Sequence, residues 1–271
     1  MKKIISFALI LFLISGNFIS CRKKNKYPPA LLPVETMLID FSDFILPSGT
    51  SGNILGAKGI TGDNWQFAAD IVSDWRTLIT RELSIPVSAY KVAATGYEAS
   101  HLSGNKWEWS YNANVAGALY KVRLIGETSG LQVKWEMYVS KDGSDGFSEF
   151  KWLAGTSNTN GTEGKWIFQE SNTSQIDFLQ IDWTRSGTKI EKIKYTFLKS
   201  GLSKDSYIEY GTASGSYDFS YAVHYYNPDL VKFSDVNIEW IASKEGRIKS
   251  ADYIDGEWKC WDTYKINASC N

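Results

Sequence analysis

Apolar and polar side chains alternate along most of this chain after residue 96, with the period of two that is typical of half-buried strands. The clearest examples are residues 131–139 and 217–225, where nearly every odd position is apolar and most even positions are polar. Weaker versions of the same pattern occur at 107–111, 193–197 and 236–240. The alternation predicts antiparallel strands that turn one face toward a core.

Turn signals containing glycine separate these segments about every 12 to 15 residues, as at Ser129-Gly130 and Ser200-Gly201. No connection beyond Gly96 is long enough for a helix, so consecutive strands must pair as hairpins. About twelve strands in one meander exceed the usual limit of an open twisted sheet. We therefore predict an all-β fold whose up-and-down sheet curls into a barrel, a half-barrel or two packed layers.

One segment before this region has the helical period instead. Apolar residues between 63 and 83 recur at spacings of three and four, which predicts an amphipathic helix. Thr61 or Asp63 can cap its N-terminus, and Pro86 either ends it or opens a second short helix to about Ala94. We expect the apolar face to pack on the sheet, although such a stripe could also bind a partner.

The N-terminus has the features of an export signal. Basic residues at positions 2 and 3 precede an apolar run from Ile4 to Ile14, which is too short to span a bilayer. Cys21 follows after the small residue Ser20, and this arrangement resembles the lipobox of bacterial lipoproteins. The resemblance implies that residues 1–20 are removed and that Cys21 is acylated. The alternative is an ordinary secretory signal, with Cys21 free or paired elsewhere.

Residues 21–36 are basic and contain three prolines, so they predict an extended tether between an acylated Cys21 and a domain at 37–271. Within that domain, residues 37–47 could form a first strand or a segment packed under the sheet. The absence of Asp after Cys21 resembles the sorting signal for the outer membrane, and we expect the periplasmic face. The membrane is then the first expected partner, held through the N-terminal lipid.

Charge excludes one class of partner. The chain has a net charge of −1, and loss of Lys2 and Lys3 with the signal would leave 27 basic against 30 acidic side chains. The only concentrated positive charge of the mature chain lies at residues 22–26, so a nucleic-acid partner is not expected.

Common catalytic motifs are missing, and we predict no catalytic residue, cofactor or metal site. His224 could act as a base if a carboxylate such as Asp218 approached it, and His101 stands near a turn. Residues 142–146 resemble part of a calcium loop but lack its final glutamate, which favours a polar turn.

Cys260 and Cys270 have nine residues between them at the end of the chain. An exported compartment is oxidising enough for a disulfide, so we expect these two cysteines to be bridged. Two buried free thiols are the alternative. No third Cys or His lies nearby to complete a metal site.

The combination of anchor, N-terminal helix and large sheet resembles, in architecture alone, the lipoprotein-localisation factors LolA and LolB. A shared fold does not fix a shared function, but the apolar strand faces and the amphipathic helix lead us to expect a non-enzymatic binding protein that holds an apolar or amphipathic ligand between sheet and helix. A glycan-binding module with exposed aromatic rings is the second hypothesis. A hydrolase with two carboxylates converging in one cleft is the third. The ligand and the oligomeric state are left open.

Overall fold

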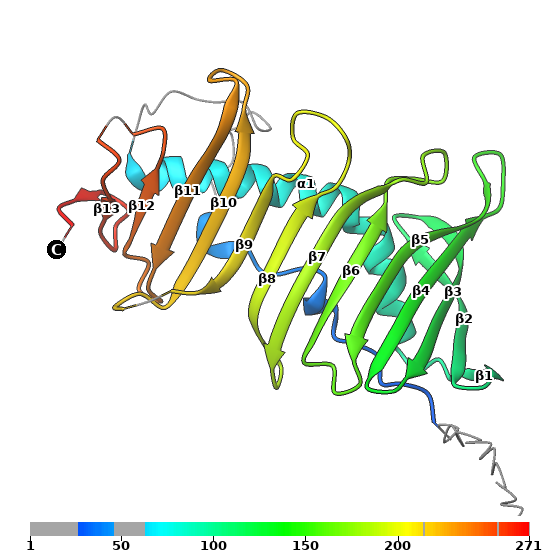
Figure 1. The fold of residues 1–271 in the computed structure, drawn as a ribbon. Helices are drawn as coiled ribbons and strands as arrows, with labels where there is room; N and C mark the ends of the chain where they lie inside the picture. The colour runs from blue at the N-terminus through cyan, green and yellow to red at the C-terminus, as the bar shows by residue number, and fades with distance from the viewer. Residues whose placement is uncertain (1–26, 46–62, 214, 254, 271) are drawn as a thin grey trace, which may run out of the picture.

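The computed structural model describes residues 27–45, 63–213, 215–253 and 255–270 (Figure 1). It contains one long helix, α1 (Asn64–Ala93), and fourteen strands in a single sheet. Every strand pairs antiparallel with the next in sequence, so the predicted meander with an N-terminal helix is confirmed. The strands are β1 (Ser100–Ser103), β2 (Lys106–Val115), β3 (Ala118–Ser129), β4 (Gln132–Lys141), β5 (Phe147–Asn158), β6 (Glu163–Gln169), β7 (Asp177–Ser186), β8 (Lys189–Phe197), β9 (Tyr207–Thr212), β10 (Phe219–Asn227), β11 (Lys232–Trp240), β12 (Gly246–Ser250), β13 (Lys259–Trp261) and β14 (Asn267–Ala268).

The sheet is open, so the closed barrel among the predicted forms is wrong. Its first strand β1 pairs only with β2, and its last strand β14 pairs only with β13. The inner face needs no closure because α1 and the N-terminal segment cover it. The number of strands exceeds the predicted twelve because β1, β13 and β14 have only four, three and two residues. Such short strands do not show a recognisable alternation in the sequence.

Helix α1 is continuous through Pro86, where the sequence predicted an end or a break. Proline removes one backbone hydrogen bond, but the turn that follows is held by tertiary packing. Tyr90 is 1% exposed there, and the hydroxyl of Tyr111 in β2 donates to the carbonyl of Ala89 at 2.9 Å. Packing against the sheet therefore outweighs the local penalty of the proline.

The other end of α1 is held by the C-terminal hairpin. Asp63 is the N-cap residue, but its side chain makes no capping bond, and Thr61 lies outside the described residues. The backbone N–H of Asn64 donates instead to the side-chain oxygen of Asn267, at 2.7 Å. The amide of Asn64 also donates to the carbonyl of Cys260 at 2.9 Å, so α1 connects opposite ends of the sheet.

Residues 27–45, called here the N-terminal segment, pass between α1 and the sheet. They form no strand but contain two short 3-10 turns, η1 (Val34–Thr36) and η2 (Ser42–Phe44). Leu32 and Thr36 are 5% and 0% exposed. The part of the expected tether from Leu32 to Thr36 is therefore packed into the domain, whereas Tyr27 is 79% exposed.

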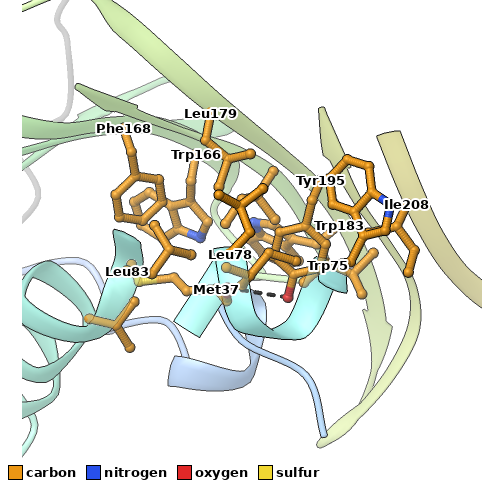
Figure 2. Packing of buried hydrophobic residues seen from close by; sticks show 14 of the residues in the cluster. Met37, Trp75, Leu78, Leu83, Trp166, Phe168, Leu179, Trp183, Tyr195 and Ile208 are labelled. Carbon is orange, nitrogen blue, oxygen red and sulfur yellow. Dashed lines mark hydrogen bonds between the residues drawn. The ribbon is translucent and has the colours of Figure 1, made fainter. Parts of the chain in front are cut away.

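Two buried tyrosines satisfy the backbone of this segment. The Tyr90 hydroxyl donates to the carbonyl of Leu32 and accepts from its N–H, both at 3.0 Å. The Tyr195 hydroxyl donates to the carbonyl of Met37 at 3.3 Å (Figure 2). It also accepts from the N–H of Ile39 at 3.1 Å. Burial raises the pKa of both hydroxyls well above their usual range, so they stay neutral donors.

Tryptophans of the sheet hold two further side chains of the segment. The indole N–H of Trp166 donates to the Thr36 hydroxyl at 3.1 Å, and that of Trp240 donates to the Asp43 carboxylate at 2.8 Å. Both rings are almost fully buried. The N-terminal segment is therefore an integral part of the hydrophobic core.

Glycines inside strands let large indole rings approach the backbone. An added Cβ at Gly155 would lie 2.3 Å from the ring of its cross-strand neighbour Trp166. The same cross-strand arrangement recurs at three other pairs: Gly126 with Trp135, Gly164 with Trp183 and Gly246 with Trp261. A side chain at these positions would displace the ring from the inner face.

We expect Tyr90→Phe and Tyr195→Phe each to lower the free energy of unfolding by about 1 to 3 kcal/mol. Each change leaves one buried N–H and one buried carbonyl without a partner. Chemical denaturation monitored by circular dichroism measures the loss. Tyr138→Phe is the control because that ring lies half-buried beside Arg123 on the outer face, and it should change stability by less than about 0.5 kcal/mol. Equal stability of all three variants would contradict this role.

Gly155→Ala should destabilise the protein by about 1 to 3 kcal/mol, since the new methyl group clashes with Trp166. Gly211 in β9 is the matched control because its nearest neighbour to an added Cβ lies 3.8 Å away. Gly211→Ala should be neutral or slightly stabilising. Thermal unfolding distinguishes the two, and equal effects would contradict the glycine–tryptophan arrangement.

Candidate functional site

In the described residues, the space between helix and sheet is filled by the protein's own side chains. The sequence led us to expect a ligand there. Figure 2 shows Trp75, Leu78 and Leu83 of α1 close to rings of the sheet, with Met37 of the N-terminal segment beside them. Trp75 and Met37 are only 1% and 0% exposed. Two openings of ligand size lie instead at the margins of this packed layer.

The first opening, called here the helix-side cleft, lies between α1 and the ends of β7 and β8. Its volume is about 340 Å³. Its apolar lining consists of Leu78 from α1, Phe178 from β7 and Phe197 from β8, which are 8%, 8% and 7% exposed. Phe197 also stacks on Trp75 at 5.1 Å between ring centroids, so this lining is continuous with the core.

Charged residues surround the apolar lining as two ion pairs. Arg81 contacts Glu82 at 2.7 Å, and Lys199 donates to Glu170. That hydrogen bond lowers the pKa of Glu170, which keeps the carboxylate charged at neutral pH. The side chains of Arg81 and Lys199 are 57% and 50% exposed, against 27% for each glutamate. The cations are thus the groups most accessible to a ligand.

The loop from β8 to β9 forms the outer wall of the helix-side cleft. Gly201 has φ of +141° with nothing within 4 Å of an added Cβ, and Leu202 is 68% exposed. A free leucine beside an apolar cleft can cover a ligand that enters it. The loop therefore provides apolar contact area that the folded chain does not use.

The second opening, called here the segment-side cleft, has a volume of about 310 Å³. One wall consists of Tyr210 of β9, Phe219 of β10 and Trp240 of β11. Ring centroids are 6.3 Å apart for Tyr210 and Phe219 and 5.5 Å apart for Phe219 and Trp240. Tyr210 and Phe219 are half-buried, so part of each ring is accessible.

Three acidic side chains of the N-terminal segment line the opposite wall: Glu35, Asp40 and Asp43. Asp40 accepts from the backbone and the hydroxyl of Ser42, while Asp43 accepts from Trp240 and Lys244. Burial, and after it the charge of Asp43, raises the pKa of Tyr210. Acids therefore converge here, as the hydrolase hypothesis requires, but two of them already stabilise the fold.

A third opening is lined by residues of the sheet and its turns. It has a volume of about 420 Å³ across β5 to β8, and its lining includes Thr156, Glu163, Asp182 and Lys192. Trp183 also lines it, and none of its lining residues belongs to α1 or to the N-terminal segment.

The two histidines lie outside these clefts. His224 Nδ1 is 2.7 Å from Asp235, and its ring stacks on Phe233 at 4.5 Å. Asp218, the carboxylate that we considered, accepts instead from the N–H of Ala242. His224 thus belongs to a cross-strand stack on the outer face, which is an ordinary structural role.

His101 Nε2 lies 3.1 Å from the carbonyl of Gly104 in the β1–β2 turn. The turn that resembled a calcium loop has its acids occupied by lysines, Lys121 with Asp142 and Lys141 with Asp145. Within the described ranges, no group of three or more potential metal ligands occurs.

The cysteines separate into two cases. The structure joins Cys260 and Cys270 in a disulfide, with Cα atoms 5.2 Å apart. Cys21 and the signal sequence lie outside the described residues. In the part of the chain that is described, no helix is both long and apolar enough to cross a bilayer.

Comparisons of the chain with protein-family models, curated proteins and solved structures find no significant match. Function must therefore be argued from the clefts. One sequence pattern pointed to the helix-side cleft: residues 176–183 carry apolar side chains on both faces of the strand. No comparable sequence pattern indicated the second cleft, because its two walls are far apart in the chain: Asp43 and Trp240 are separated by 197 positions.

Proposed function

We propose that this protein is an exported, lipid-anchored binding protein whose helix-side cleft takes a small amphipathic molecule with an anionic head. The observation that carries the proposal is the combination of an apolar lining with two outward cations, Arg81 and Lys199. A pocket of about 300 Å³ or more with few polar groups is typical of small-molecule sites.

The apolar lining defines the tail of the ligand. Leu78, Phe178 and Phe197 belong to the packed core, so their positions are already set before binding. An acyl chain laid against them would also contact Leu202, which is otherwise exposed to water. Burial of these surfaces favours association by about 25 cal/mol per Å² before the costs of binding.

The ion pairs define the head. Each glutamate is less exposed than its basic partner, so a carboxylate or phosphate would meet the cations first. A charge-assisted hydrogen bond from Arg81 or Lys199 would then orient the molecule with its tail inward. Single-chain fatty acids and lysophospholipids have this chemistry, and the membrane that holds the anchor is a source of both.

The anchor rests on the sequence. The apolar run, the small residue before Cys21 and the basic residues after it support acylation and attachment to the periplasmic face of the outer membrane. Leu32 is already buried in the fold, so only residues 22–31 lie between the lipid and the first buried residue of the domain. Such attachment would keep the clefts close to the membrane surface.

Leu202→Asp should weaken binding of a fluorescent fatty acid, 11-(dansylamino)undecanoic acid, by about tenfold or more. The change removes apolar contact and adds a negative charge beside the head. Fluorescence titration of detergent-free protein measures the affinity. Leu131→Asp is the matched control, because Leu131 is 81% exposed on the distant β3–β4 turn. Unchanged affinity in both variants, or no binding by the wild type, would contradict the proposal.

Cys21→Ala should move the protein from the membrane fraction to the soluble fraction of the producing bacterium, because the acyl chains are lost. Fractionation followed by immunoblotting measures the distribution. Cys270→Ala provides the comparison, since it removes a cysteine remote from the signal and should leave the protein in the membrane. Membrane retention of the Cys21→Ala protein would exclude the lipid anchor.

A further inference from the structure

We infer that the segment-side cleft is a second binding site and that its ligand is a neutral saccharide. The site is separate from the helix-side cleft, with which it shares no lining residue. The inference therefore stands independently of the amphipathic ligand proposed above. It rests on the aromatic wall, the polar wall and the charge of the cleft.

The aromatic wall offers the kind of surface on which a sugar ring packs. Tyr210 and Phe219 come from neighbouring strands, and their planes differ by only 23°. Trp240 is only 3% exposed and packs against these two rings, and its indole N–H donates to Asp43, which fixes the orientation of the ring. Because the C–H groups on one face of a pyranose are apolar, they can lie against such rings.

The opposite wall presents hydroxyl-binding groups. Glu35 and Asp40 are exposed acceptors on the N-terminal segment. Thr188 in the β7–β8 turn and Lys189 at the start of β8 are exposed groups that can donate. Asp40 is held in place by two hydrogen bonds from Ser42, at 2.8 and 2.9 Å. A polyol can both donate and accept, so it can satisfy both kinds of group at once.

The charge of the cleft disfavours an anionic ligand. Asp43 is paired with Lys244, which leaves two carboxylates, Glu35 and Asp40, against the one cation Lys189 among the lining residues. A fatty acid would place its own charge beside these carboxylates, which is unfavourable. The two clefts thus differ in the ligand charge that each tolerates. Exposed cations line the helix-side cleft, and exposed carboxylates line the segment-side cleft.

Saturation-transfer NMR and isothermal titration with maltotriose, cellotriose, chitotriose and mannotriose test the inference on the folded domain. We expect at least one trisaccharide to bind, with Phe219→Ala weakening it by about tenfold. Phe219→Tyr keeps a ring and should retain binding. Phe233→Ala is the matched control, since Phe233 is a 40% exposed ring on the outer face of β11.

Thr188→Trp gives a second test that does not depend on the stability of the Phe219 variant. Thr188 is exposed at the turn, so a bulky ring there should fill the mouth of the cleft and abolish binding. Leu202→Asp, which acts on the other cleft, should leave saccharide affinity unchanged. Absence of binding by all four trisaccharides, or equal affinity in wild type and Thr188→Trp, would overturn the inference.

Discussion

The need to satisfy a buried, irregular stretch of backbone is the constraint on which the rest of this structure depends. The N-terminal segment lies between α1 and the sheet, where its peptide groups have no strand partner. Tyr90 and Tyr195 replace the missing partners, each by donating one hydrogen bond and accepting another. Since unpaired buried peptide groups are costly, these two hydroxyls allow the helix, segment and sheet to form one core.

This layered core also determines where a ligand can bind. A sheet covered by a helix alone could leave an internal cavity, but here the segment and the indole rings occupy that position. Two of the three openings lie where the covering layer meets the sheet, one beside α1 and one beside the segment. Their chemistry differs because α1 supplies Arg81 to the first, while the segment supplies Glu35 and Asp40 to the second.

Several elements were predictable from local pattern, and others were not. Alternation in β4 and β10 identified those strands because each has one face in the core. The helix was expected to end near Pro86, yet it continues because Tyr90 and its neighbours pack on the sheet. Gly246 opens β12 directly beside the ring of Trp261. No local sequence pattern predicts contacts of this kind.

The sequence alone determined the class of fold, the disposition of apolar faces and the expectation of export, because each depends on the order of residues along the chain. Only the tertiary structure decided that the sheet stays open and that the N-terminal segment lies inside the core. It also decided which residues meet at the clefts, since Asp43 and Trp240 are 197 positions apart and are joined only by folding. The physical reason is that periodicity reports which face is buried, whereas contacts across a core depend on which buried faces meet.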